Sequence, residues 1–483
     1  MSIPLPIIIQ GGMGVAVSNW RLARAVSQAG QLGVVSGTLI SVVLSRRLQA
    51  GDPDGAMRRA LENFPLPDVA ARVLAAHYIP GGKPAHAAFA MSPMPVAPLT
   101  AGQEELEMLA SFTEVFLAKE GHDGLVGINL LEKIQFSTLP ALYGALLAGV
   151  DYVLMGAGVP RAIPGALDAL AEGRDASLKL DLADDQRPEN EPPVLHFSPR
   201  DHFAEPPRLS RPSFIAIVSS SSLAVTLARK STGRVDGFVV GAPTAGGHNA
   251  PPRGPARLNA AGEPIYGPRD EPGLERIREL GLPFWLAGNA AGPTQLAEAF
   301  NAGATGVQIG TAFAFCEESG LTDEIKQQVR ALSRAGLARV HTDPLASPTG
   351  FPFKVVQIAG TLASRAVYRE RPRVCDLGYL RQSWRRPDGT LGYRCPAGVP
   401  AQYAHQGGAT ADTEDRKCLC NGLLAAVGLP QTRRHGYVEP PLVTAGEDVA
   451  DIARFIPAGA ETYHAADVLA HVLGAADDAT PAG

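Results

Sequence analysis

Two glycine-rich turns in the second half of the chain carry residue types that suit the binding of a phosphate group. They contain Gly288, Asn289, Gly292, Gly310 and Thr311. Small residues let backbone N–H groups approach an anion, and a helix that begins at such a turn adds a favourable dipole. We therefore expect a phosphate at these turns. The alternative is that the glycines only permit tight bends.

A histidine in the segment GAPTAGGHNAPPRG could take part in proton transfer. His248 follows Gly246 and Gly247, so its imidazole can project with little crowding from the backbone. The pKa of a free imidazole lies near neutrality, which suits a group that accepts a proton. A loop histidine that packs or faces solvent is the alternative interpretation.

The segments QGGMG and GLVGINLL carry two further candidates for ligand binding. Gly11, Gly12 and Gly14 surround Met13, and such a turn brings backbone amides and a polarizable side chain to a flat ligand. Asn129 ends an apolar run, where a buried amide needs hydrogen-bond partners that a ring amide could supply. Glycine-rich turns are common, and an asparagine that only forms a turn is the alternative for the second segment.

Four of the five cysteines lie close together near the C-terminal end of the sequence, at Cys375, Cys395, Cys418 and Cys420. Four thiolates could hold a structural zinc ion. Their spacing is irregular, however, and Cys-Leu-Cys is less typical of zinc sites than Cys-x-x-Cys. Unpaired buried thiols are therefore the favoured interpretation, and no metal is expected. Cys316 is interpreted as a packing residue.

Short apolar runs separated by helical stretches must position these residues. The runs lie at 6–10, 31–37, 124–131, 151–158, 214–220, 236–243, 283–290 and 306–314. They are rich in β-branched residues and lack alternation, which is typical of parallel strands buried on both faces. The pattern predicts a (β/α)8 barrel, in which function lies at the C-terminal ends of the strands. An open doubly wound sheet is the alternative.

Two of the intervening helices have recognisable ends. Ser18 is the expected cap of the first, and Gly30 ends it. The second follows Gly292-Pro293 and ends at Gly303. The residues expected to face inward are Trp20, Leu22, Ala23, Val26 and Ala29 in the first helix and Leu296, Ala299 and Phe300 in the second.

The chain is longer than a plain barrel needs, and two kinds of extra sequence are visible. We assign residues 1–365 to the barrel, with a helical insertion at about 48–112 and an exposed hairpin at about 174–212. Residues 366–483 form a C-terminal appendage with the four cysteines and terminal helices, of which 475–483 are expected to be a frayed tail.

Composition excludes several classes of protein. The net charge is −5, from 48 acidic and 43 basic side chains, which gives no basic field for nucleic acid. The N-terminus does not resemble a signal peptide, and no stretch has the ~20 uninterrupted apolar residues of a membrane span. Five cysteines in 483 residues do not form a disulfide framework. We therefore expect a reduced, cytoplasmic protein without a membrane or nucleic-acid partner.

The first loop, the Ala-Gly-Gly-His element and the ending Gly-Val-Gln-Ile-Gly-Thr-Ala-Phe together resemble the nitronate monooxygenases, formerly called 2-nitropropane dioxygenases. The resemblance covers roughly residues 5–315, in the same order as in that family. It implies a (β/α)8 barrel with FMN at its mouth. Flavin-dependent enoyl-acyl-carrier-protein reductases share the fold and much of the motif set.

The resemblance also implies roles for individual residues. His248 matches the active-site histidine of the family, and the loop around Met13 would lie along the isoalloxazine ring. Asn129 would contact the ring region, while Gln308 and Thr311 would lie near the phosphate. The full set expected to contact FMN is Gly12, Met13, Gly14, Asn129, Gly246, Gly247, Gly288, Asn289, Gln308, Gly310 and Thr311.

The chain departs from the family pattern at two positions. Gly12 stands where relatives usually have proline, and Asn289 stands where they usually have a second glycine. An asparagine side chain could itself donate to a phosphate, so FMN binding is still expected. We expect the two departures to affect which substrate the protein accepts rather than whether it binds FMN.

Three functions follow from these observations. The first is oxidation of alkyl nitronates by O2 to a carbonyl compound and nitrite. The second is reduction of an enoyl thioester with NAD(P)H, with acyl carrier protein as partner. A basic patch of Arg253, Arg257 and Arg269 would favour it, but a loop whose arginines are only solvated is the favoured interpretation of these residues. The third is a non-catalytic binding subunit, in which the appendage is the docking surface.

Overall fold

The computed structural model describes residues 5–183 and 191–474. Its main sheet has eight parallel strands in the order β1-β10-β9-β8-β7-β4-β3-β2. The strands are β1 (Ile8–Gln10), β2 (Gly33–Ser36), β3 (Val126–Leu131), β4 (Tyr152–Gly156), β7 (Ser213–Val218), β8 (Gly237–Gly241), β9 (Phe284–Ala287) and β10 (Gly306–Ile309). Each predicted apolar run coincides with one of them, although β7 begins one residue before its run.

The sheet closes on itself between its first and last strands. Ile9 pairs with Leu32 in a parallel bridge, and the Gln10 N–H donates to the Leu32 carbonyl at 2.9 Å. The Leu32 N–H in turn donates to the carbonyl of Ile8 at 3.1 Å. The predicted (β/α)8 barrel is therefore confirmed, and the open doubly wound sheet is wrong.

The apolar runs are continuous because both faces of each strand are buried. One cluster fills the inside of the barrel with side chains that alternate along the strands, among them Ile9, Val34, Ile215 and Trp285. A larger cluster lies between the strands and the outer helices. Trp285 is fully buried, and its indole N–H donates to the carbonyl of Pro6 at 2.8 Å.

The helices that cover the barrel are α1 (Trp20–Gln28), α6 (Thr138–Leu147), α7 (Ile163–Ala171), α8 (Ser221–Lys230), α9 (Leu274–Arg278), α10 (Pro293–Asn301) and α11 (Thr311–Ala314). The residues expected to pack inward from α1 are buried, except Ala29, which lies exposed just after the helix. The predicted cap is wrong by one residue: Asn19 accepts from the N–H of Leu22 at 3.0 Å. Ser18 is turned toward the loop after β1 instead.

The orientation of α10 was also predicted correctly only in part. Leu296 and Ala299 are buried as expected. Phe300 is 46% exposed, because it lies next to Ala299 around the helix and faces away from the strands. Gly303, at φ +82°, follows the helix end as predicted.

The stretches at 48–112 and 174–212 both lie between strands of the barrel. The first contributes α3 (Ala56–Glu62), α4 (Pro67–His77) and most of α5 (Ala101–Lys119), which pack with α2 (Ile40–Gln49) between β2 and β3. The second contains an antiparallel pair, β5 (Ala176–Lys179) and β6 (Val194–Phe197). Part of the connection between these two strands lies outside the described residues, as does the expected tail at 475–483.

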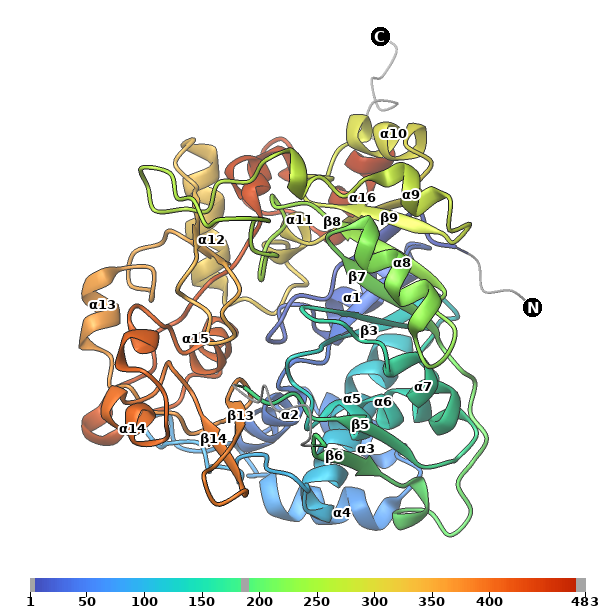
Figure 1. Ribbon diagram of the computed structural model, residues 1–483, viewed down its shortest axis with the longest axis vertical. Helices are drawn as coiled ribbons and strands as arrows, with labels where there is room; N and C mark the ends of the chain where they lie inside the picture. Colours follow the sequence, from blue (N-terminus) through green and yellow to red (C-terminus); the bar gives the residue numbers. More distant parts are fainter. Residues whose placement is uncertain (1–4, 184–190, 475–483) are drawn as a thin grey trace.

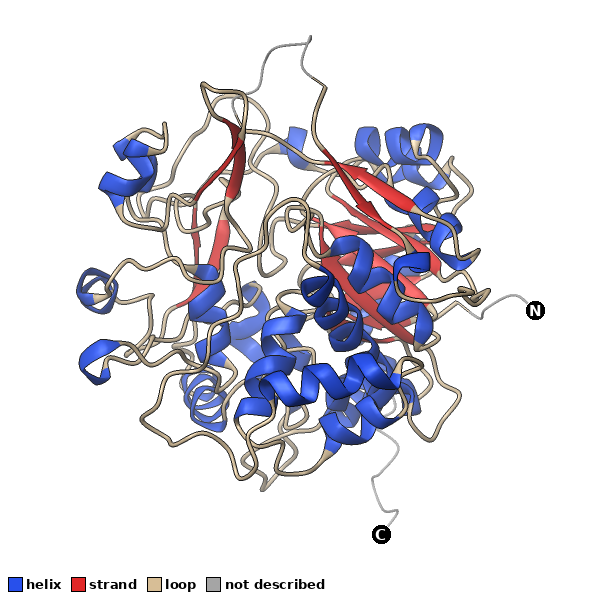
Figure 2. Cartoon of the chain, turned by 90° about the horizontal axis from the view of Figure 1, so that it is seen from below, coloured by secondary structure: helices blue, strands red, loops and turns tan. Residues whose placement is uncertain are grey.

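The chain after the barrel forms α12 (Asp323–Arg334), β11 (Val340–Asp343), β12 (Phe353–Val356), α13 (Arg365–Glu370), β13 (Gln382–Arg385), β14 (Leu391–Arg394), α14 (Pro400–His405), α15 (Leu419–Ala426), a 3₁₀ segment (Glu447–Phe455) and α16 (Ala465–Leu473). Figure 1 shows α13, α14 and α15 on the opposite side of the molecule from β7 and α8. Figure 2 shows two-stranded sheets of this region apart from the barrel strands.

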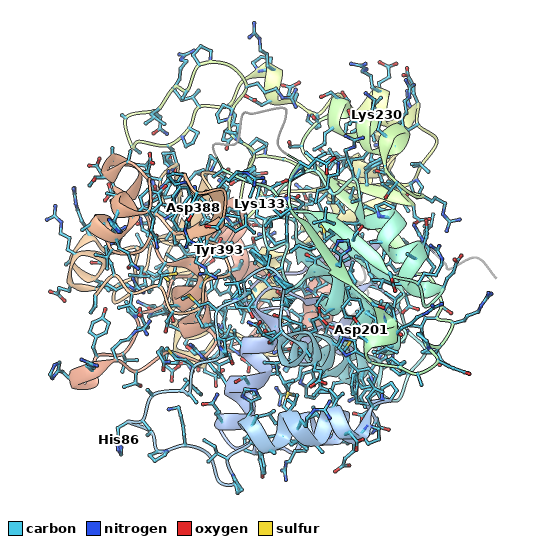
Figure 3. The ribbon with its side chains drawn as sticks, turned by 60° about the horizontal axis from the view of Figure 1, so that its bottom comes forward. His86, Lys133, Asp201, Lys230, Asp388 and Tyr393 are labelled. Carbon is cyan, nitrogen blue, oxygen red and sulfur yellow. The ribbon has the colours of Figure 1, made fainter. Side chains whose placement is uncertain are left out.

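This C-terminal part packs against the barrel in two places. In Figure 3 Tyr393 of β14 is labelled near the centre of the view, and its ring meets that of Phe136 edge-on, with 5.8 Å between the ring centroids. Val449, Phe455 and Tyr463 belong to the same apolar cluster as the outer faces of the barrel strands. No helix among residues 5–183 and 191–474 is long and apolar enough to cross a membrane.

Candidate active site

The mouth of the barrel holds a pocket of about 500 Å3. It is lined mainly by small and apolar residues from the loops that follow the strands, as is usual for cofactor and substrate sites. All of the residues predicted to bind a cofactor, together with His248, line this one pocket. Their sequence positions span almost three hundred residues, so the closed barrel is what brings them together.

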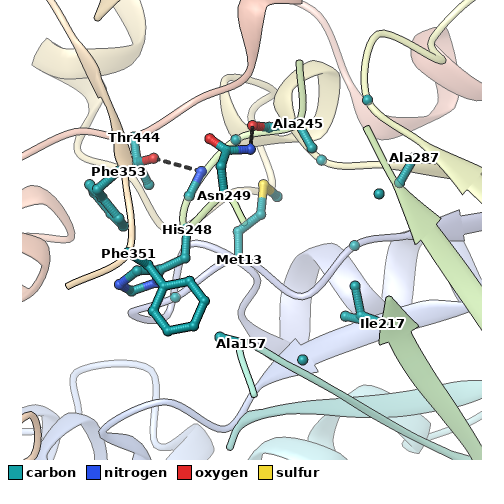
Figure 4. A pocket seen from close by; sticks show the side chains of 18 of the residues that line it. Met13, Ala157, Ile217, Ala245, His248, Asn249, Ala287, Phe351, Phe353 and Thr444 are labelled. Atoms are coloured by element: carbon teal, nitrogen blue, oxygen red, sulfur yellow. Dashed lines mark hydrogen bonds between the residues drawn. The ribbon is translucent and has the colours of Figure 1, made fainter. Parts of the chain in front are cut away.

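Hydrogen bonds from buried polar side chains fix the conformation of the loop after β1. The Ser18 hydroxyl donates to the carbonyl of Gly11 at 2.9 Å and accepts from the N–H of Met13 at 2.9 Å. The Gln10 amide donates to the same hydroxyl at 2.8 Å, and its oxygen accepts from the N–H of Val34 at 3.0 Å. These bonds satisfy the backbone of the turn and leave Met13 facing the pocket (Figure 4).

Gly12 is required by its neighbour on β3. A Cβ built on Gly12 would overlap the Cβ of Asn129 and would lie 3.2 Å from a methyl group of Val34. Any other residue, proline included, would displace the asparagine. Asn129 itself donates to the carbonyl of Leu130 at 3.2 Å and keeps a partly exposed face toward the pocket.

The turn after β9 has a backbone that most residues cannot adopt. Gly288 has φ +105°, and a Cβ there would lie 2.6 Å from the Thr244 hydroxyl and 3.1 Å from the N–H nitrogen of Ala245. Asn289 follows at φ +51°, in the left-handed region that asparagine tolerates better than most residues. The asparagine is therefore compatible with the left-handed backbone of this turn.

The turn after β10 meets the C-terminal segment rather than open solvent. The Thr311 hydroxyl accepts from the N–H of Gly446 at 2.7 Å and is hydrogen-bonded to the carboxyl group of Asp448. Asp448 is only 8% exposed, and burial raises its pKa, although the bond to Thr311 opposes the shift. An acidic side chain thus lies beside the turn that was predicted to hold a phosphate.

His248 projects into the pocket next to two aromatic rings (Figure 4). Its ring lies edge-on to Phe353 at 4.8 Å and to Phe351 at 6.3 Å, and its Nε2 is 2.7 Å from the hydroxyl of Ser347. Burial lowers the pKa of His248 to about 4, so the imidazole is neutral at physiological pH. It can accept or donate a hydrogen bond there but is a weak base.

Two side-chain oxygens at the pocket are buried without a partner among the described residues. They are Oε1 of Gln308 and Oδ1 of Asn249. The amide nitrogen of Asn249 is held by the carbonyls of Pro243 and Ala245, so its oxygen cannot turn away. Buried acceptors of this kind are rarely left unsatisfied in a complete site. The pocket therefore offers acceptors to a ligand that carries N–H or O–H groups.

Comparison with known proteins gives structural similarity at low identity. No protein-family model and no curated protein matches the chain. The chain is similar to FabK from Thermotoga maritima, at 16% identity over 97% of this chain and 92% of that one, with a TM-score of 0.48. It is also similar to a nitroalkane oxidase from Streptomyces ansochromogenes, at 16% identity over 98% and 97%, with a TM-score of 0.44. A third similar structure is the enoyl reductase domain of MlnA from Bacillus amyloliquefaciens, at 11% identity over 97% of this chain and 91% of that one, with a TM-score of 0.46. Likeness at this level carries no functional argument, so function must be argued from the site.

Several pocket residues were not found from the sequence. Phe351, Phe353, Thr444 and Asp448 all come from the chain beyond the last barrel strand. The Thr444 hydroxyl accepts from the N–H of Gly247 at 3.0 Å and so helps to position the loop that carries His248. Nothing in the spacing of these residues signals that their segments return to the barrel mouth.

The four cysteines of the appendage line a second, small cavity. Among residues 5–183 and 191–474, no group of three or more histidine, cysteine or acidic side chains is arranged to hold a metal ion. The structure therefore gives no support to the zinc alternative. Cys316 is fully buried beside α11, in keeping with a packing role.

The three arginines of the predicted basic patch lie in the long loop after β8. Arg253 lines the pocket, and one of its guanidinium N–H groups donates to the carbonyl of Arg269 at 2.7 Å. Arg253, Arg257 and Arg269 are exposed, and none of them forms an ion pair with a described residue. Their charges are thus available at one edge of the pocket.

Proposed function

We propose that the protein is an FMN-dependent oxidoreductase that oxidises alkyl nitronates with O2 to a carbonyl compound and nitrite. The observation that carries the proposal is the pocket itself. Glycine turns after β1, β9 and β10, unsatisfied acceptors and a single histidine converge on a space whose volume suits a cofactor with a small substrate.

The residues present fit FMN, except for the acidic side chain of Asp448 beside the turn proposed for the phosphate. The loop around Met13 offers backbone groups and a sulfur atom to a flat ring, and Gln308 Oε1 offers an acceptor to a ring N–H or a ribityl hydroxyl. The turns at Gly288, Asn289 and Gly310 would hold the phosphate through backbone N–H groups. When bound, FMN supplies the two-electron redox chemistry and the reaction with O2.

His248 would orient the substrate rather than remove a proton from it. Because the imidazole is neutral and of low basicity, it suits a nitronate, which has already lost its α-proton, better than a neutral nitroalkane. Ser347 fixes the ring through Nε2, and the two phenylalanines exclude water from that side. The substrate would therefore lie between His248 and the loop around Met13.

The test is an assay of the purified, air-equilibrated protein with propyl-2-nitronate and with 2-nitropropane. We expect a yellow protein that consumes O2 and releases nitrite faster with the nitronate than with the nitroalkane. A colourless protein that takes up no added FMN would contradict the flavin assignment. A yellow protein that releases no nitrite would support the flavin assignment but contradict the assignment of a nitronate as substrate.

A second candidate is a flavin-dependent enoyl reductase, which the three unpaired arginines favour. Arg253, Arg257 and Arg269 could attract an anionic carrier such as acyl carrier protein to the mouth of the pocket. This function predicts NAD(P)H oxidation coupled to reduction of an enoyl thioester, without nitrite. It also predicts that charge reversal of the arginines raises KM for the carrier-bound substrate only.

A further inference from the structure

The four cysteines of the C-terminal part converge although they are distributed over 46 positions of the chain. Cys375 follows α13, Cys395 follows β14, and Cys418 and Cys420 lie at the start of α15. All four line one small cavity, together with Asp376 and Asn421. The β13–β14 hairpin returns the chain and so brings Cys395 to Cys375.

Cys375 and Cys395 are in direct contact. Both line the same small cavity and are partly exposed, whereas Cys418 and Cys420 are buried. Gly398 packs over the pair: a Cβ there would lie 3.2 Å from the Cys395 carbonyl oxygen and 3.8 Å from the Cβ of Cys375. The carbonyl of Cys395 and the Cβ of Cys375 therefore lie close to the same point of the structure.

The two thiols have opposite acid–base character. Interaction with the neighbouring Cys395 thiol lowers the pKa of Cys375, with burial opposing and the charge of Arg381 assisting. The same interaction and burial raise the pKa of Cys395. A thiolate is the nucleophile in thiol chemistry, so the partly exposed Cys375 is the reactive member and Cys395 is placed to resolve it.

We propose that Cys375 and Cys395 are a redox-active dithiol that a peroxide oxidises to a disulfide. The Cys375 thiolate attacks one peroxide oxygen, the O–O bond breaks, and a sulfenic acid forms while the other oxygen leaves as water after taking up a proton. The sulfur of Cys395 then attacks the sulfenic sulfur, the S–O bond breaks, and a second water leaves. The thiols lose two electrons and two protons, and hydrogen peroxide is reduced to two waters.

The cavity adjoins the wall of the barrel pocket. Leu380, Leu419 and Cys420 line both spaces. Leu380 is five residues after Cys375, and Leu419 belongs to the helix that carries the other two cysteines. A disulfide between Cys375 and Cys395 would therefore shift side chains that also line the barrel pocket. The site does not depend on the nature of the bound cofactor.

The experiment treats the reduced, desalted full-length protein with hydrogen peroxide. Remaining thiols are then alkylated, and peptides are mapped by mass spectrometry without reduction. We expect a loss of two thiols, one linked peptide pair that joins Cys375 to Cys395, and full reversal by dithiothreitol. In Cys395→Ser, the sulfenic acid should persist at Cys375 and be trapped by dimedone. Cys316→Ser, which changes a buried thiol remote from the cavity, is the matched control and should oxidise as the wild type does.

Three results would overturn the proposal. The first is a linkage that joins other cysteines, and the second is a protein that keeps all five thiols under peroxide. The third is stoichiometric zinc or iron in the purified protein, released when the thiols are blocked, which would show a metal centre instead. Peptide mapping of the wild type decides the first two results even where a cysteine variant fails to fold.

Discussion

Replacement of Gly288 by alanine should destabilise the turn after β9 and weaken FMN binding. At φ +105° an L-residue is strained by about 1–3 kcal/mol. The new Cβ would lie 2.6 Å from the Thr244 hydroxyl and 3.1 Å from both the Ala242 Cβ and the Ala245 nitrogen. Overpacking of this kind costs about 1–3 kcal/mol. The two terms together amount to about 2–6 kcal/mol.

The cost can appear in two measurable forms. If the turn keeps its path, the free energy of unfolding of the apoprotein falls by that amount. If the turn moves, its backbone N–H groups move with it and no longer fit the phosphate. A loss of about 2 kcal/mol in the free energy of FMN binding then weakens the affinity about 30-fold. Denaturant unfolding of the apoprotein gives the first quantity, and quenching of FMN fluorescence on titration with apoprotein gives the second.

Gly292→Ala is the matched control in the same turn. Gly292 has extended backbone, at φ −156° and ψ 161°, which any residue adopts. The nearest atom to its new Cβ is the end of the flexible Gln295 side chain, which can rotate away. We expect a loss of about 1 kcal/mol or less, the value of a poorer helix cap. Wild-type stability together with wild-type FMN affinity in Gly288→Ala would refute the reasoning. Lost stability with unchanged affinity would show that the turn keeps its path and that the cost falls on folding alone.

Three further substitutions test other parts of the site and fold. Asp448→Asn should tighten FMN binding about fivefold but leave riboflavin binding unchanged, because about 1 kcal/mol of carboxylate–phosphate repulsion is removed. Parallel titrations with the two flavins measure this change, and equal effects on both would contradict it. His248→Ala should lower kcat/KM for a nitronate about tenfold, the value of one neutral hydrogen bond, at unchanged FMN affinity; steady-state kinetics decide. Burial raises the pKa of Glu107 from 4.5 to about 7, against hydrogen bonds from Ser41 and Tyr379. The folded protein therefore holds a proton that the unfolded chain releases, so stability falls by about 3 kcal/mol as pH rises from about 4.5 to about 7. Glu107→Gln should abolish this fall in unfolding curves recorded across that range, and an unchanged pH profile would show that the carboxyl does not titrate there.

The barrel could be predicted from the sequence because its strands are buried on both faces. A strand such as β4, with all five residues buried, needs a continuous apolar run, which is visible without any long-range information. Details that depend on a single side chain were less predictable. Ser18 and Asn19 are both good helix caps, and only the tertiary structure decides that Ser18 supports the loop after β1 while Asn19 caps α1.

The parts of the candidate site that directly follow barrel strands could be predicted from the sequence. The parts that come from the C-terminal segments, far away along the chain, could not. The glycine turns and His248 follow strands directly, so the barrel rule locates them. Asp448 and Phe353 reach the pocket through long-range packing of the C-terminal part, which leaves no periodic signal in the sequence. The basicity of His248 was also out of reach, because the pKa depends on burial by those same segments.

The two residues that depart from the expected family pattern both suit the backbone of this pocket. A Cβ at Gly12 would displace Asn129, and Asn289 lies at a φ of +51° that asparagine tolerates. Neither change removes a backbone group from the pocket. A difference in substrate should therefore be sought on the opposite wall, where Phe351 and Phe353 hold a neutral His248. That wall comes from chain outside residues 5–315, so substrate choice can change there while the glycine turns that we propose for FMN stay as they are.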